Sequence, residues 1–353
     1  MILNCNISVS FIKWIVIVLF LAANQACTTL YPISFAEVVP ASYYVDKRVS
    51  KVTLINLAPI QRTPSYQIVL PNKPPVPVDS VWCDDFNEVV LFNFYDDLIS
   101  RQFFDTVVVD SLEYSLYMSQ IKSNSLSVLL DSICYTTNTE GVFFISHCNY
   151  GSSLFIEPIY DNLFWGYLEA RGAVRLGFYN SISQTFEDTY LFTDSLFING
   201  SSGTLTEFNS SLPTPSNFIR SVGEKLGHQV VNRYVPYWQS VNREVFKGGN
   251  YFFILGGEAM DKEDWNGAIQ SFHFALDKGS KLTKARAAYN LAVMAEMRGD
   301  INSALGWIQK SIELYSKYKW SNSSEIVMVN EYFDVLKMRL VAVNKLSEQL
   351  NDE

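Results

Sequence analysis

The feature that most constrains the fold of this chain is a doubling of sequence near its C-terminus. The stretch GDINSALGWIQKSIELY, at residues 299–315, has a near-copy upstream in EDWNGAIQSFHFALDKG, at residues 263–279. A repeat of this kind predicts helical units that stack, with small residues where helices cross and bulky residues filling the space between them. The aligned positions are Leu255, Gly256, Ala259, Ala268, Phe272 and Ala275 in the first unit, and Leu291, Ala292, Ala295, Ala304, Ile308 and Ser311 in the second.

This doubling resembles the tetratricopeptide repeat (TPR), whose period is about 34 residues, with two residues added between the units. Residues 233–320 are therefore predicted to form TPR-like helical repeats. Two repeats need a cap, because each repeat buries its apolar face only against its neighbours. Residues 321–353 predict that capping helix, and the alternative is that this helix pairs with a second protomer. Its apolar residues recur every three or four positions, at Ile326, Val329, Phe333, Leu336, Leu340 and Val343.

The first half of the chain predicts a sheet covered by helices. Aromatic residues make up 14% of the chain, which favours a strand-rich portion. Residues 51–57 are apolar on both alternating faces and predict a central strand. A helix is expected from Asp110 to Ser132, then a strand from Gly141 to Cys148.

An antiparallel hairpin is expected over residues 172–194, followed by a helix over 218–231. The Pro-rich residues 63–78 predict a surface loop without regular structure. The predicted class is α+β: a mixed-sheet α/β sandwich at residues 51–232, followed by the all-α TPR-like repeat.

The N-terminus predicts export. Residues 1–26 contain Lys13 and the apolar run WIVIVLFLAA, which suits a signal peptide and is too short for a membrane span of roughly 17–25 residues. Cys27 follows the small residue Ala26, as in a bacterial lipoprotein signal, and we predict that Cys27 carries a lipid. Residues 27–50 would then form a lipid-anchored N-terminal segment. The alternative is ordinary cleavage and a free product.

Three further cysteines remain in the predicted mature chain, Cys83, Cys134 and Cys148. In an exported protein one pair is possible, and Cys134 could approach Cys148 if a helix end folds back onto a strand. Three buried thiols are the alternative.

The charge and the motifs exclude several classes of function. The formal net charge is -9, with no dense Lys and Arg cluster, which argues against a nucleic-acid partner. Only three histidines occur, with no metal-ligand spacing, and His147 and Cys148 should point to opposite faces of a strand. No nucleophile elbow or phosphate-binding loop is present. We therefore expect no metal, no cofactor and no enzymatic activity. Paired acids such as Glu187 and Asp188 are interpreted as solvated.

Two groups of residues are candidates for partner binding. The segment NRYVPYWQSVNREVF combines the Arg, Tyr and Trp residues that are frequent in binding hot spots, and its alternative role is to join the two domains. The other candidate is the concave face of the repeat helices, because such repeats hold extended peptides. The candidates are Arg233, Tyr237, Trp238 and Arg243 in the segment, and Phe252, Tyr289, Asn290, Met294 and Arg298 on the concave face.

Blocks of residues 27–316 are similar to an uncharacterised lipoprotein family of the Bacteroidetes, a domain of unknown function with a TPR-like C-terminus. The resemblance rests on VVPASYYVDKRVSKVTLINL, AVRLGFYN, GHQVVNRYVPYWQSVNREVFKGGNYF, DWNGAIQSF and KARAAYNLAVMAEMRGDINSALGWIQKSI. The chain departs from it in the hairpin, where Val174 and Arg175 replace a usual Trp-Arg pair. The order of elements also resembles, at the level of fold, the N-terminal domains of curli-secretion lipoproteins and TolB.

Family membership implies a bacterial cell-envelope location and a binding or assembly role. The sequence thus predicts a non-enzymatic lipoprotein, anchored to the membrane by lipid, in the outer membrane and facing the periplasm or the cell surface. It would act by protein binding or as a scaffold, in envelope assembly or secretion. The alternative is a surface glycan-binding lipoprotein.

Overall fold

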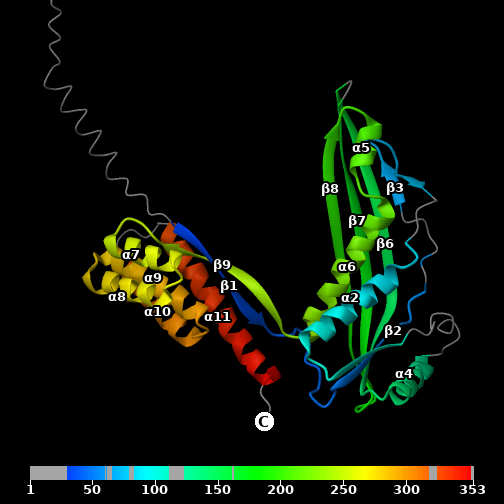
Figure 1. Ribbon diagram of the computed structural model, residues 1–353, viewed down its shortest axis with the longest axis horizontal. Coiled ribbons are helices and arrows are strands. Elements are labelled where there is room, and N and C mark those ends of the chain that lie inside the picture. The colour runs from blue at the N-terminus through cyan, green and yellow to red at the C-terminus, as the bar shows by residue number, and fades with distance from the viewer. Residues whose placement is uncertain are drawn as a thin grey trace, which may run out of the picture. The chain divides into compact units, whose positions relative to one another are not determined.

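The computed structural model in Figure 1 resolves into two compact units. The α/β unit runs from Ala41 to Tyr237, and the helical unit combines the described residues up to Pro40 with those from Trp238 onward. A mixed sheet followed by C-terminal helices confirms the predicted α+β class. Cys27 and the predicted signal peptide lie outside the described residues. The structure describes residues 30–59, 61, 66–78, 83–110, 123–160, 163–317 and 324–350.

Seven of the described strands form the sheet of the α/β unit. Five of them follow the order β4-β3-β6-β2-β5, while β7 pairs with β6 and β8 pairs with β7. Strand β2 is parallel to both β5 and β6 and is buried on both faces, so the predicted central strand is confirmed. The strands are β2 (Lys51–Asn56), β3 (Tyr66–Val69), β4 (Val76–Val78), β5 (Thr106–Asp110), β6 (Gly141–Tyr160), β7 (Leu163–Asn180) and β8 (Thr185–Ser202).

The strands β6, β7 and β8 are long and antiparallel, with 20, 18 and 18 residues. The predicted hairpin is present, and both of its strands extend well beyond the predicted ends. Strand β6 is long enough to pair with β2 near its beginning and with β3 further along. These three strands are therefore the frame on which the rest of the unit is built.

One side of β6, β7 and β8 is covered by helices, and we call it the inner face (Figure 1). The covering helices are α2 (Phe86–Arg101), α5 (Leu205–Ser211) and α6 (Pro215–Tyr234). Apolar residues at alternate strand positions point into this layer, as the pleat requires. The largest of the buried side chains here include Phe86, Phe94, Phe143, Phe178 and Tyr234, all fully buried.

Helix α6 is present as predicted, begins three residues before the predicted residue 218, and lies close to α2. Thr214 accepts a hydrogen bond from the Asn217 N–H, and Pro215 occupies the first turn, where its missing N–H costs nothing. Gly227 lets the two helices approach, since a Cβ there would lie 2.7 Å from the Val90 carbonyl oxygen. This contact fixes both helices on the inner face.

The opposite side of these strands is the outer face, and one helix covers only its end. Helix α4 (Ser123–Thr137) packs on Val142, Phe144 and Tyr179. It includes part of the helix expected from Asp110 to Ser132, but residues 111–122 lie outside the described part of the chain. Beyond α4, the outer face carries polar and small residues together with several accessible aromatic and aliphatic ones.

The prediction that residues 63–78 lack regular structure is wrong for the described part of this range. Strands β3 and β4 both lie within it and pair antiparallel. Strand β4 tolerates Pro77 because it lies at the end of the strand order, where a missing N–H breaks no continuing ladder.

The helical unit stacks the predicted repeat helices in sequence order. They are α7 (Tyr251–Asp261), α8 (Trp265–Lys278), α9 (Lys281–Met297) and α10 (Ile301–Ser316). Ala268 and Ala304 are fully buried, as are the larger Phe272 and Ile308, so the packing expected from the doubling is observed. Their assignment as tetratricopeptide repeats stays a prediction.

Two elements complete the helical unit. Helix α11 (Ser324–Leu350) packs on α10, and its side chains Val329, Tyr332 and Leu336 are buried. The strands β1 (Leu30–Val39) and β9 (Tyr237–Phe246) form a two-stranded sheet that the sequence analysis did not anticipate. Arg339 of α11 binds β1 through Glu37, at 3.0 Å, and through the Val38 carbonyl.

The fold answers whether the cysteines pair and whether a described helix could cross a membrane. Cys83, Cys134 and Cys148 are free, buried thiols. Cys148 packs in the inner-face core, whereas Cys134 belongs to α4 and packs on the outer face, so the two cannot form the disulfide that was considered. Among the described helices, none is long and apolar enough to cross a membrane.

Candidate functional site

A shallow hollow of about 740 Å³ lies on the outer face of the α/β unit, and we call it the outer trough. Its floor is built from three cross-strand rows of small and polar residues. The rows are Asn149, Ala173 and Thr193; Gly151, Arg171 and Ser195; and Gln67 and Ser153. The hollow exists because small residues occupy positions where neighbouring rows carry large ones.

Aromatic residues border the trough at one end, and we call them the aromatic shelf. The Phe155 and Tyr167 rings are stacked with centroids 5.2 Å apart, and the Trp165 ring meets Tyr167 edge-on at 5.9 Å. All three side chains are half-buried, which leaves part of each ring accessible. At the other end, His147 and Arg175 face each other across β6 and β7 and are exposed.

The trough carries charges of both signs, since Arg171 and Asp194 are both among its lining residues. Arg171 is 61% exposed on the floor, and its Nε lies 3.3 Å from the carboxylate of Glu169. An exposed pair of this kind contributes little to stability, so its charges remain available to a ligand. The trough therefore offers hydrogen-bond donors and acceptors, one cation and a flat apolar border.

The predicted site residues Arg233 and Tyr237 lie in the α/β unit, away from the trough floor. The Arg233 guanidinium binds the Asp188 carboxylate with two hydrogen bonds of 2.6 and 2.8 Å, and the Tyr234 hydroxyl donates a third at 2.7 Å. Burial acts to raise the pKa of Asp188, but the hydrogen bonds from Arg233 and Tyr234 outweigh it and hold the pKa below its usual value. Arg233 is thus a clamp on the inner face.

Tyr237 and Arg233 also line a second hollow, of about 310 Å³, beside β8. The Arg101 guanidinium lies 5.8 Å from the centre of the Tyr237 ring and donates a 2.7 Å hydrogen bond to Asn232. The two predicted residues are therefore brought together, mainly by contacts within the α/β unit.

Arg243 lies in the helical unit and has a similar role. Its guanidinium binds the Glu296 carboxylate at 2.8 and 2.7 Å, and the Tyr332 hydroxyl donates to the same carboxylate at 2.7 Å. The Glu296 side chain is only 1% exposed. This buried ion pair holds β9, α9 and α11 together, and leaves Arg243 little capacity to bind a partner.

The concave-face residues divide into buried and accessible ones. Tyr289, Asn290 and Met294 are buried, contrary to the surface position expected for them. The Asn290 amide donates to the Phe246 carbonyl at 2.8 Å and accepts from the Phe246 N–H at 2.9 Å, which joins α9 to β9. The strand β9 thus covers the side of α9 that a peptide would need.

The other predicted residues of this unit are accessible but dispersed. Trp238 is 72% exposed, and Arg298 is exposed and bonded to Asn266. Phe252 is half-buried and stacks on Phe274, with ring centroids 5.9 Å apart. The structure does not gather them into one surface.

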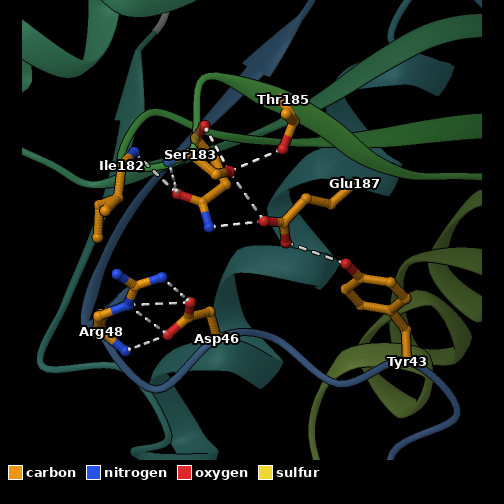
Figure 2. Close-up of polar contacts among 8 residues, drawn as sticks. Tyr43, Asp46, Arg48, Ile182, Ser183, Thr185 and Glu187 are labelled. Atoms are coloured by element: carbon orange, nitrogen blue, oxygen red, sulfur yellow. Dashed lines mark hydrogen bonds and ion pairs between the residues drawn. The ribbon is translucent and has the colours of Figure 1, made fainter.

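The acids Glu187 and Asp188 are not solvated as interpreted, because both carboxylates are bonded. Figure 2 shows the Glu187 carboxylate at the start of β8, accepting from Asn180 at 2.7 Å, from Ser183 at 3.1 Å and from Tyr43 at 3.0 Å. Burial, together with Glu187, raises the pKa of the Tyr43 hydroxyl. These contacts fasten the segment around Tyr43 to the hairpin.

Within the described ranges, no three or more His, Cys, Asp or Glu side chains are grouped so as to hold a metal ion. His147 is exposed while Cys148 is buried, so these neighbours do point to opposite faces. Burial raises the pKa of the Cys148 thiol to about 12, which disfavours the reactive thiolate.

The trough residues were not predicted from the sequence. Their signal was the alternation in β7, where inward Leu168, Ala170 and Val174 alternate with outward Glu169 and Arg171. That alternation shows which residues share a face, but only the pairing with β6 and β8 brings Asn149, Ser153 and Ser195 to the same place.

Comparisons with solved structures find only distant likeness. The PelC dodecamer from Paraburkholderia phytofirmans shares 11% identity over 57% of this chain and 98% of that chain, with a TM-score of 0.26. A minor lipoprotein from Acinetobacter baumannii shares 11% over 54% and 99%, with a TM-score of 0.24. Lipoprotein GNA1162 from Neisseria meningitidis shares 11% over 52% and 99%, with a TM-score of 0.21. Scores this low indicate neither ligand nor partner for this chain.

Family models match both units of the chain, whereas no curated protein sequence matches it. Residues 255–338 match a domain of unknown function, DUF6340, which covers most of the repeat helices. The Bacteroidetes origin stays a prediction. A second model, which spans nearly the whole sheet and its helices, matches residues 49–246, more than half of the chain. The chain therefore belongs to the family described as a domain of unknown function, DUF8603.

Proposed function

We propose that this protein is a non-enzymatic, lipid-anchored protein of the bacterial cell envelope, in the outer membrane, that binds another protein through the outer trough. The observation that carries the proposal is the trough itself, an open polar hollow with an aromatic border on a long, helix-backed sheet. Sites on regular elements hold their side chains in place, so a partner meets a preformed surface.

The state of the acidic side chains supports binding over catalysis. Asp188, Glu296 and Glu325 are each held by an arginine and a tyrosine. Carboxylates so engaged stabilise the fold and are poor proton carriers, because protonation would break their bonds. The two acids at the trough are engaged as well: Asp194, which lines it, is paired with Lys225, and Glu169 beside it with Arg171.

The proposed lipid anchor at Cys27 is close in sequence to the helical unit. Cys27 lies three residues before Leu30, the first residue of β1, and β1 belongs to the helical unit. A lipid on Cys27 would therefore be close in sequence to the helical unit, whereas the trough belongs to the α/β unit. Fatty-acid labelling of the wild type against Cys27→Ser tests this step, and equal labelling of the two would exclude the anchor at Cys27.

The partner is tested by photo-crosslinking in intact cells. A photo-reactive residue at Asn149, exposed on the trough floor, should form an adduct with a specific envelope protein. The same residue at Glu224, exposed on α6, is the matched position outside the trough. We expect Arg171→Glu to abolish the Asn149 adduct and Lys310→Glu, an exposed charge reversal on α10, to leave it. Equal adducts from both positions, or an adduct that survives Arg171→Glu, would refute the trough as the binding surface.

A second candidate, glycan binding, is favoured by the aromatic shelf. Sugar rings stack on flat aromatic faces, and the floor supplies planar side chains in Gln67, Asn149 and Arg171 for their hydroxyl groups. Binding to a glycan array that is lost in Trp165→Ala and retained in Trp238→Ala would support this function. A silent array with the wild-type protein would rule it out in favour of a protein partner.

A further inference from the structure

The edges of the sheet in the α/β unit are protected to different degrees. At one end of the strand order, β4 has three residues and includes Pro77, and at the other end β5 has five residues. Strand β8 has 18 residues, and among the described strands it pairs only with β7. Its far side is a long edge with backbone groups available for another strand.

Strand β8 has no basic residue and no proline at its edge, and its three acids are engaged within their own unit. Residues 185–202 contain no Lys, Arg or Pro, although these are the residues that commonly block an edge. Its acids are bound within their own unit: Glu187 as in Figure 2, Asp188 to Arg233, and Asp194 to Lys225 at 3.0 Å. The Ser195 N–H turns to the Asp194 carboxylate at 2.7 Å, as an edge donor does when no strand accepts it.

Apolar side chains on this strand are exposed in a symmetric pattern about Asp194. Leu191 and Phe197 lie three residues to either side of it on the outer face, with 43% and 74% of their surface exposed. Tyr190 and Ile198 lie four residues to either side on the inner face, 45% and 38% exposed. An antiparallel copy of the strand, centred on Asp194, would place Leu191 against Phe197 and Tyr190 against Ile198. This self-complementarity is what a two-fold interface requires.

We infer that β8 pairs antiparallel with β8 of a second copy of the chain, with the two-fold axis at Asp194. The two sheets then join into one continuous sheet, and the edge backbone groups of both strands are satisfied together. The Asp194 side chains meet near the axis, where each is neutralised by its own Lys225. Because such an axis runs perpendicular to the sheet, both outer troughs come to the same side of the pair. This inference is independent of which partner the trough binds.

The pairing is tested with two differently tagged full-length copies in the same cells. The copies should co-purify, and Phe197→Lys should reduce co-purification at least tenfold, because it puts a charge opposite Leu191 on an open edge. Phe274→Lys is the matched control, since Phe274 is also an exposed aromatic, on α8. Copies that do not co-purify, or that co-purify equally with Phe197→Lys, would overturn the inference. Arg171→Glu should leave self-association intact, which separates this test from that of the trough.

The register is tested by disulfide trapping. A chain with Leu191→Cys and Phe197→Cys should form a covalent dimer under mild oxidation, because the axis at Asp194 places these positions opposite each other. A chain with Leu191→Cys and Ser195→Cys, which would face each other only about an axis at residue 193, should stay monomeric on a non-reducing gel. The reverse result, or no dimer from either chain, would overturn pairing about Asp194.

Discussion

The inner and outer faces of β6, β7 and β8 are made by the same strands and have opposite properties. Tyr150 and Val174 on the inner face are buried, whereas their sequence neighbours Asn149 and Ala173 line the open trough. Because successive side chains of a strand alternate, each strand supplies a core and a surface at once. Stability in this unit is therefore carried by the inward residues and the proposed binding surface by the residues between them, so that one can be changed without the other.

The largest effect is expected from a change at the centre of the inner face. Phe143 is fully buried and lies against the rings of Phe94, Phe178 and Tyr234. Phe143→Ala removes most of these contacts and leaves a cavity, which should lower the free energy of unfolding by about 3–5 kcal/mol. Urea unfolding of the α/β unit, followed by circular dichroism, measures the change.

The control for this prediction is Phe143→Leu, which keeps most of the buried volume and should cost clearly less than Phe143→Ala. A loss below about 1 kcal/mol for Phe143→Ala would mean that the inner face collapses around the cavity. The difference between the two faces in their contribution to the free energy of unfolding would then be smaller than the burial of Phe143 indicates.

A smaller effect, dependent on pH, is expected from the inner-face carboxylate. Asp188→Asn removes the charge that holds Arg233 and Tyr234, and should cost roughly 1.5–3 kcal/mol at neutral pH. The pKa of Asp188 is lowered in the folded state, so its contribution is present above the unfolded pKa and is lost as the pH falls through the folded value. The stability difference between wild type and Asp188→Asn should therefore shrink below about pH 4.

Chemical unfolding of both proteins at neutral and acidic pH checks this prediction. Thr189→Ala, on the neighbouring outward position of β8, serves as the control and should show no such pH dependence. A difference that stays constant across the pH range would contradict the ionised Asp188–Arg233 pair.

Local periodicity was enough to predict the strands β2 and β6, the β7–β8 hairpin, helix α6 and the repeat helices. It was not enough where structure depends on distant pairing. Strand β1 is a strand because β9 lies beside it, more than 200 residues later. Helix α2 was not predicted at all, and its sequence FNEVVLFNFYDDLISR has many apolar residues because it packs on the sheet and, along its side, on α6.

The candidate site was harder to predict for the same reason. The composition of residues 233–243 indicated binding, but Arg233 and Arg243 find carboxylates 45 and 53 residues away and become buried clamps. No local pattern shows whether an arginine has such a partner. The trough floor, in turn, consists of ordinary small residues, such as Gly151 and Ser195, whose meaning appears only once four strands are in register.

The smallest effect on stability is expected from a substitution on the outer face. It tests most directly whether the two faces differ in their contribution to stability. Arg171 is 61% exposed and forms an ion pair with the neighbouring Glu169, so Arg171→Ala should change the free energy of unfolding by less than about 0.5 kcal/mol. Gly172, the next residue, faces inward, where a Cβ would lie 2.8 Å from Val222 and 2.9 Å from Leu226, so Gly172→Ala should be clearly destabilising. Urea unfolding of these two adjacent substitutions compares the faces directly. If Arg171→Ala costs as much as Gly172→Ala, the outer face is part of the stabilising core, and the trough is not a surface free to bind a partner.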